Sequence, residues 1–199
     1  MINYQNTIFV GLFFLIFLIL LELAKRRFKI NSEYSRKFAH IIGGMFVIFS
    51  SGYINKNGYL ILTIIFLIIF IISRRNKLLT SFSDVSRKTF GEITYLMGLF
   101  ILGYVFFDQK IYFVPSLLIL IFPDSVAGLV GYQINRSKKT LVGSVIYFSI
   151  AIVILSFFFP IFLSLGMALA LTIIEFVSPY GFDNLTIPVF FILLIKLLF

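Results

Sequence analysis

The sequence contains no cysteine and only one histidine, His40. The lack of cysteine excludes disulfides, thiolate nucleophiles and the usual zinc ligand sets. A single histidine cannot build an imidazole cluster, so any bound metal must rest on oxygen ligands. We therefore expect the chemistry of this chain to depend on carboxylates, hydroxyls and basic side chains.

Acidic residues are scarce, since eight Asp and Glu stand against 17 Lys and Arg, which gives a net charge of +9. Three of the carboxylates, Asp124, Glu175 and Asp183, lie inside or beside long apolar runs. An unpaired charge deep in a membrane span costs about 3 kcal/mol on insertion scales, and acids in such positions are functional candidates. These three residues therefore stand at the centre of the expected chemistry.

Apolar residues make up 60% of the chain, and the mean hydropathy is +1.07. Soluble domains are only about half apolar. Because a spanning helix needs about 20 residues, we predict an all-α, polytopic integral membrane helical bundle with about seven or eight transmembrane helices. We expect it to form a single domain over residues 1–199. The candidate spans are Thr7–Ala24, Phe38–Ile54, Tyr59–Ser73, Ile93–Phe107, Ile111–Ile134, Ser144–Phe159, Ile161–Val177 and Leu185–Phe199.

The basic residues divide unevenly between alternate loops, as the loops of membrane proteins do. The first apolar run has no basic residue before it and three after it, which is opposite to a secretory signal peptide and indicates an outside N-terminus. With that orientation, 14 of the 17 basic residues lie in inner loops. These are Lys25, Arg26, Arg27, Lys29, Arg36, Lys37, Arg74, Arg75, Lys77, Arg87, Lys88, Arg136, Lys138 and Lys139. Topology and anionic lipid explain the charge, so we expect no nucleic acid partner.

The same alternation places His40, Glu92, Asp124, Glu175 and Asp183 at the cytoplasmic ends of the spans. None of these five is among the basic residues counted above, so their position is an independent observation. Two independent features therefore indicate an active site on the cytoplasmic face, where a cytosolic nucleotide and a lipid headgroup can meet.

Two segments combine basic residues with a titratable group. In residues 36–44, His40 shares a helix face with Arg36 and Lys37, and two glycines follow that allow close helix approach. That pattern fits phosphate binding or, equally, a basic anchor with a packed histidine. In residues 87–95, capping of a helix entrance explains Glu92, while a functional version would have Arg87 contact phosphate.

Asp124 follows a continuous apolar stretch and precedes several small residues. Gly128 and Gly131 lie on its face of the helix, and Ala127 with Gly131 forms a small-xxx-small pair. We favour a functional carboxylate here. The alternative is tight helix packing around a structural one.

Two further loops carry polar residues. Residues 136–144 place lysines, hydroxyls and a glycine before a new helix, where they can surround phosphate, although the P-loop order is missing. The alternative there is a basic loop with Ser144 as N-cap. Residues 175–188 hold two carboxylates and no basic residue on the basic face, which suggests Mg²⁺ or ion pairing. Asp183 or Asn184 can instead cap the last helix.

Taken in order, these segments resemble the family of dolichol kinases, phytol kinases and CTP-dependent diacylglycerol kinases, more distantly related to phosphatidate cytidylyltransferases. The resemblance covers about residues 36–188 and depends on five short patterns in the family's order. They are R-K-x-x-H at 36–40, G-E-x-x-Y at 91–95, D-x-x-A-x-x-x-G at 124–131, K-T-x-x-G-S at 139–144 and D-N-x-x-x-P at 183–188. Where family members often carry a glutamate before the glycine of the lysine loop, this chain has Val142.

The resemblance implies a CTP-dependent kinase that transfers the γ-phosphate to a membrane lipid alcohol, which is a polyprenol or dolichol, a phytol-like isoprenoid or a diacylglycerol. It implies Asp124, Glu175 and His40 as catalytic residues, with Glu175 or His40 as the base, and Mg²⁺ held by Asp124 and Asp183. The residues expected to contact the nucleotide and its phosphates are Arg36, Lys37, Arg87, Gly128, Gly131, Lys138, Lys139, Thr140, Gly143, Ser144 and Asn184.

Two other functions stay open at this point. A cytidylyltransferase would transfer CMP, rather than phosphate, to an acidic lipid. A lipid transporter or scramblase would be expected to have broken helices that meet near the membrane midplane and often inverted repeats, neither of which is clear in this sequence.

Overall fold

The computed structural model describes residues 4–76, 78–83, 89–135 and 138–199. Within these ranges the chain is helical and has no strand, as predicted. In this described part of the chain, eight helices have 16 residues or more and one has four. They are α1 (Tyr4–Phe28), α2 (Ser32–Ser50), α3 (Lys56–Asn76), α4 (Thr80–Ser83), α5 (Gly91–Phe106), α6 (Lys110–Ile134), α7 (Leu141–Ser156), α8 (Ile161–Val177) and α9 (Asp183–Leu198).

The predicted spans correspond in order to the eight long helices, and most of their ends differ by a few residues. The largest error concerns α2, which begins at Ser32 rather than Phe38. Asn31 caps this helix, because its side-chain oxygen accepts a hydrogen bond from the Glu33 amide at 2.9 Å. The earlier start brings residues 36–37 into the helix, where both are buried.

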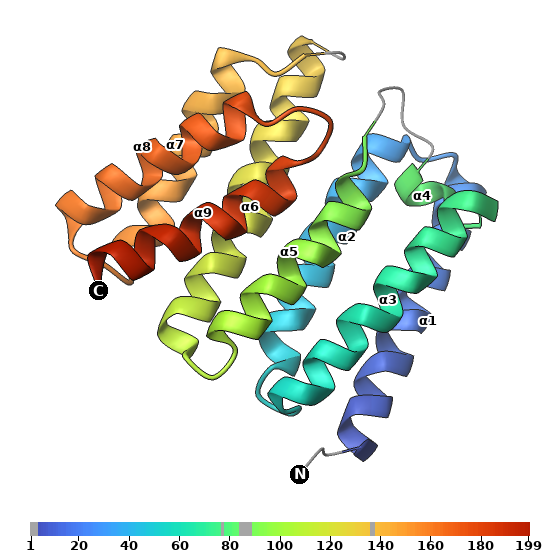
Figure 1. Ribbon diagram of the computed structural model, residues 1–199. Coiled ribbons are helices and arrows are strands. Elements are labelled where there is room, and N and C mark those ends of the chain that lie inside the picture. The colour runs from blue at the N-terminus through green and yellow to red at the C-terminus, as the bar shows by residue number, and fades with distance from the viewer. Residues whose placement is uncertain (1–3, 77, 84–88, 136–137) are drawn as a thin grey trace.

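Consecutive long helices run in opposite directions, so their ends gather in two groups (Figure 1). The ends of α1, α3, α6 and α8 lie at the upper end of the view, together with the starts of α2, α5, α7 and α9. The basic last turns of α1 and α3 are part of this upper group. Residues far apart in the sequence therefore meet at one end of the bundle, as the charge pattern predicts.

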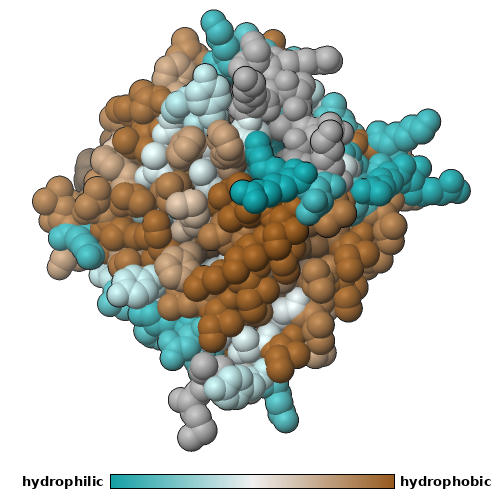
Figure 2. Space-filling model, turned by 45° about the vertical axis from the view of Figure 1, so that its right-hand side comes forward, coloured by the Kyte–Doolittle hydropathy of each residue, from teal (hydrophilic) through white to brown (hydrophobic). Residues whose placement is uncertain are grey.

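The outer surface of the bundle is largely apolar. Phe9, Phe162 and Leu197 are each more than 70% exposed, and Figure 2 shows a broad brown area across the middle of the visible face with teal side chains gathered above it. Among the described helices, α1, α3 and α6 are long and apolar enough to cross a membrane, while α5, α7 and α8 are shorter apolar helices. The fold is thus compatible with a membrane protein, and the number of crossings and their orientation stay predictions.

Helix α6 packs against α2, α5, α7 and α9. Leu117 and Ile119, which point to opposite faces of the helix, are both fully buried, so α6 packs against its neighbours on two opposite sides. The helix contains Pro115 and Pro123, each of which removes one backbone hydrogen bond and is tolerated because neighbouring helices surround it. Pro123 directly precedes Asp124, where the polar end of α6 begins.

Glycines allow two of these helix contacts to be close. A Cβ added at Gly44 of α2 would overlap the Ile121 side chain of α6, which confirms the predicted role of that glycine. A Cβ at Gly98 of α5 would overlap the backbone oxygen of Asn184 at the start of α9. A backbone neighbour cannot turn aside as a flexible side chain can, so Gly98 permits the contact between α5 and α9.

We expect Gly98→Ala to lower the free energy of unfolding by about 1–3 kcal/mol, because the added methyl group overpacks this contact. The matched control is Gly166→Ala in α8, where a Cβ meets nothing within 4 Å. Alanine favours a helix over glycine by about 1 kcal/mol, so the control should be neutral or slightly stabilised. Thermal melting of the detergent-purified variants measures both effects, and equal melting temperatures would contradict the close contact.

Candidate functional site

A small pocket at the upper end of the bundle collects most of the polar residues that the sequence singles out. It draws on the end of α6, the loop that follows it and the starts or ends of α7, α8 and α9. We call it the polar pocket, and the residues that line it are Lys37, Asp124, Ala127, Gly128, Gly131, Tyr132, Lys138, Lys139, Thr140, Gly143, Ser144, Glu175 and Asp183. Acids and bases from distant parts of the chain therefore face one space.

One side of the polar pocket is built by an ion pair between α2 and α6. The Lys37 ammonium donates to Asp124 Oδ2 at 2.6 Å and to the Asp124 backbone oxygen at 3.0 Å. His40 Nε2 lies 3.9 Å from the same Asp124 oxygen. The side chains of Lys37 and Asp124 are only 6% and 5% exposed, so each charge depends on the other for compensation.

The other side is built around Lys139, whose ammonium donates to Glu175 Oε1, to the Glu175 backbone oxygen and to Asp183 Oδ2. The distance to Asp183 Oδ2 is 2.8 Å. Burial alone would lower the pKa of Lys139, but the charges of Asp183 and Glu175 more than offset it and hold the pKa above its usual value. The ammonium is therefore charged at neutral pH, and it lies at the C-terminal end of α8, where the helix dipole favours a cation.

The loop before α7 is shaped by a side-chain cap. Thr140, rather than Ser144, is the N-cap of α7, and its hydroxyl accepts a hydrogen bond from the Gly143 amide at 3.1 Å. Gly128 of α6 leaves room for the Lys37 side chain, because a Cβ there would lie 2.7 Å from Lys37 Cε. Val142 is 49% exposed and is not among the described residues that line the polar pocket.

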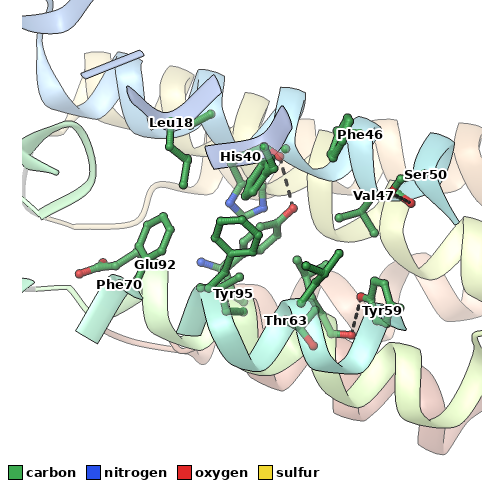
Figure 3. Close-up of a pocket in the computed structure, with 18 of the residues that line it drawn as sticks. Leu18, His40, Phe46, Val47, Ser50, Tyr59, Thr63, Phe70, Glu92 and Tyr95 are labelled. Carbon is green, nitrogen blue, oxygen red and sulfur yellow. Dashed lines mark hydrogen bonds between the residues drawn. The ribbon is translucent and has the colours of Figure 1, made fainter. Parts of the chain in front are cut away.

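A second, larger space lies directly beside the polar pocket and is shown in Figure 3. Helices α1, α2, α3 and α5 provide nearly all of its lining, which is mainly apolar, and Asn184 of α9 also lines it. We call it the apolar pocket. Lys37 lines both spaces, so the two pockets meet at this residue.

Polar side chains gather at one end of the apolar pocket. Arg36, His40, Glu92 and Asn184 line that end, and all four are buried. His40 Nε2 lies 3.1 Å from the Leu120 backbone oxygen, and its ring stacks at a tilt against Tyr95 with centroids 3.9 Å apart. This end of the apolar pocket therefore holds hydrogen-bonding groups beside the shared Lys37.

The predicted site is thus divided between two neighbouring spaces. Most of the predicted residues line the polar pocket, as expected from their loop positions. Three of them instead line the apolar pocket, namely Arg36, His40 and Asn184. Arg36 donates to Glu33 Oε2 at 2.6 Å. Arg87, which was expected to contact phosphate, lies outside the described residues.

The sequence pattern around Glu92 predicts a simple helix cap and gives no link to Arg74. In the structure Glu92 lies in the first turn of α5 and also pairs with Arg74 from the end of α3. The sequence does place both residues at the same expected end of neighbouring spans. Helical spacing, however, identifies partners only within one helix and not on different helices.

The donor set can be tested against Mg²⁺. Within the described part of the chain, no group of three Asp, Glu or His side chains forms a ready-made metal site. Asp124 and Asp183 both use Oδ2 for a lysine. Asp183 Oδ1 also accepts a hydrogen bond from the Asn184 amide at 2.9 Å, and a carboxylate oxygen has a second lone pair that can bind a cation. Mg²⁺ is usually bound by one or two carboxylates together with substrate phosphates and water. The two aspartates in one pocket fit that mode of binding.

Comparison with known proteins gives one informative match. The chain is similar to the phytol kinase of Synechocystis sp., with 27% identity over 187 residues, which covers 84% of this chain and 80% of that kinase. No protein-family model and no solved structure matches. The similarity supports a distant relationship to the phytol and dolichol kinase family and, at family level, a lipid-alcohol kinase.

We expect Lys37→Met to destabilise the protein by about 3–5 kcal/mol, because it leaves the Asp124 carboxylate buried without its partner. The double variant Lys37→Met/Asp124→Asn should recover most of this loss. As a control, Lys56→Met removes a partner of exposed Asp108 at 3.9 Å and should cost less than about 1 kcal/mol. Denaturant unfolding in detergent measures all three. Equal losses for Lys37→Met and Lys56→Met would contradict the buried pair.

Proposed function

We propose that this chain is a CTP-dependent kinase that transfers the γ-phosphate of CTP to the hydroxyl group of a membrane lipid alcohol. One observation carries the proposal, namely that a pocket of lysines and carboxylates adjoins an apolar pocket through the shared Lys37. The first suits the phosphates of a nucleotide, and the second suits a lipid. The similarity to a phytol kinase supports the same class of reaction.

The phosphates would bind on the basic side of the polar pocket. Lys139 would share its ammonium between the phosphates and the two carboxylates that now accept its hydrogen bonds. Lys138, which is exposed, and the hydroxyls of Thr140 and Ser144 line the same pocket. The N-terminal end of α7, where the helix dipole is positive, favours an anion at this place.

Asp124 and Asp183 are the residues that would hold Mg²⁺ together with the phosphates. The ion, when bound, would neutralise charge on the phosphate oxygens. Until the nucleotide arrives, Lys37 and Lys139 compensate the two carboxylates. The carboxylates therefore do not depend on the metal for stability in the folded chain.

The arrangement favours His40 over Glu175 as the base that takes the hydroxyl proton. His40 lines the apolar pocket, where the lipid would lie, whereas Glu175 lines the polar pocket and bonds Lys139. The Leu120 carbonyl can only accept, so the contact with His40 Nε2 assigns the hydrogen to Nε2 and the lone pair to Nδ1. In the proposed step the lipid oxygen bonds the γ-phosphorus, the bond to the β-phosphate oxygen breaks, CDP leaves and Nδ1 takes the proton.

Label transfer from CTP tests the proposal directly. Purified protein with Mg²⁺, γ-labelled CTP and a mixture of phytol, polyprenol and diacylglycerol should yield a labelled lipid phosphate, because the γ-phosphoryl group moves to the alcohol. Thin-layer chromatography of the lipid fraction measures the product. No labelled product from any of the alcohols would contradict the kinase.

Two controls sharpen this experiment. With α-labelled CTP and an acidic lipid, a labelled lipid product would indicate nucleotidyl transfer instead. Asp124→Asn and Lys139→Ala should each lower kcat/KM on the order of 10²-fold, as loss of a charge-stabilising group does. Lys196→Ala, in the last turn of α9, should leave it unchanged, and melting curves must show that all three variants are folded.

We propose further that the basic end of the bundle faces the cytoplasm, with the N-terminus outside. The chain has no cysteine, so each introduced cysteine is unique. A membrane-impermeant maleimide should label Asp108→Cys, between α5 and α6, in intact cells. It should label Asn76→Cys, at the end of α3, only after the membrane is permeabilised. Gel shifts of the two variants measure this, and the reverse pattern would contradict the orientation.

A further inference from the structure

The apolar pocket is long and narrow. On α2 its lining extends from Arg36 to Ser50, which is about 20 Å at a rise of about 1.5 Å per residue. On α3 it extends from Tyr59 to Phe70. The cavity volume is about 80 Å³, which is too small for two hydrocarbon chains side by side.

Its two ends differ in chemistry. Toward the far end, Ser50, Tyr59 and Thr63 are the polar side chains, and each donates its hydroxyl to a backbone oxygen. These hydroxyls therefore need no hydrogen-bonding ligand. In Figure 3, Ser50 and Tyr59 lie at one end of the pocket and Glu92 lies at the other.

At the opposite end, three buried polar atoms have no hydrogen-bond partner within the described part of the chain. They are Arg36 Nε, Glu92 Oε2 and Asn184 Oδ1, and all three residues line the pocket. Buried polar atoms without a partner are costly and call for a ligand or a water molecule. A donor and two acceptors at this end match a hydroxyl group, which both donates and accepts.

We propose that the apolar pocket binds one lipid alcohol with a single hydrocarbon chain, whose hydroxyl lies at the Arg36 end and whose tail extends toward Tyr59. The proposal rests on the proposed function, because Lys37 at the hydroxyl end also lines the pocket assigned to the nucleotide. Beyond that function, it specifies where the lipid tail lies, that the lipid has one chain and which residues limit the length of that chain.

Chain length follows from the dimensions. An extended peptide residue spans about 3.6 Å with three backbone bonds, which is about 1.2 Å per bond. An extended hydrocarbon chain advances by a similar amount, so a length of about 20 Å accommodates roughly 16 bonds. Tyr59 lines the far end and is held in place there, because its hydroxyl bonds the Leu99 backbone oxygen at 2.8 Å and its ring packs on Phe107 and Phe113. Val47 lines the pocket between the two ends.

Photolabelling locates the tail without any nucleotide. A primary alcohol of about 16 carbons with a diazirine near its tail end is irradiated with the full-length protein, and the labelled peptides are mapped by mass spectrometry. We expect label near Thr63 of α3 and Ser50 of α2, displaced by unlabelled single-chain alcohol but not by an equal amount of diacylglycerol. Label spread over lipid-facing residues such as Phe162, or equal displacement by diacylglycerol, would overturn the proposal.

A matched pair of variants tests the length limit. Val47→Phe fills the pocket about one helical turn short of its Ser50 end, and Met45→Phe adds the same ring to a position of α2 that is 43% exposed and off the pocket. Val47→Phe should weaken binding of the long alcohol on the order of tenfold, because the new ring excludes about two methylene groups of the tail from the pocket. An alcohol half as long should bind both variants alike. Equal binding of the long alcohol to both would overturn the assignment.

The two proposals fail in different ways. Specific photolabel in the apolar pocket without phosphate transfer from CTP would leave the tail site standing and remove the kinase. Transfer from CTP with label only on the outer surface would keep the kinase and remove the tail site.

Discussion

Charges inside an apolar helix bundle must be paired, and this requirement shapes both the fold and the candidate site. Lys37 of α2 pairs with Asp124 of α6, and Arg74 of α3 pairs with Glu92 of α5. A single charge left alone in such surroundings is strongly unfavourable. Each pair therefore fixes how two helices distant in sequence lie against each other. The contacts that hold this end of the bundle together also supply the charges of the pockets.

The two pockets differ in the way that a reaction between a water-soluble donor and a lipid requires. The polar pocket is formed largely by helix ends and a loop, with Lys138 exposed to solvent. The apolar pocket is lined mainly by four helices. Where they meet, the side chains of Lys37, Asp124 and His40 are at most 8% exposed. A reacting group at that junction is thus largely screened from water, which strengthens electrostatic interactions and limits hydrolysis of the donor.

The structural features that depend only on a local sequence pattern could be predicted. The apolar runs predict the order of the long helices, and helical spacing predicts that Asp124, Gly128 and Gly131 line one pocket. The start of α2 could not be predicted from hydropathy, because it depends on a cap at Asn31. An Asn can be predicted as a helix cap only when the polar residues that follow it are also predicted to be helical.

Features that depend on how helices meet could not be predicted. Helical spacing puts Arg36 and Lys37 at adjacent positions of one helix, yet a turn of about 100° between them directs Arg36 to the apolar pocket and Lys37 to both. The apolar pocket itself is lined mainly by apolar side chains, which are equally suited to packing and to lipid. No sequence pattern distinguishes those that leave a space between helices.

Lys37 also lies at the boundary between a water-facing space and a hydrocarbon-facing space. Its flexible side chain lines both of these spaces. In the proposed reaction the tail would therefore stay in hydrocarbon from entry to release, while only the headgroup changes charge at the surface. Withdrawing a long tail into water would cost about 0.8 kcal/mol for each methylene, so the phosphorylated product would leave by sliding sideways into the leaflet from which its precursor came.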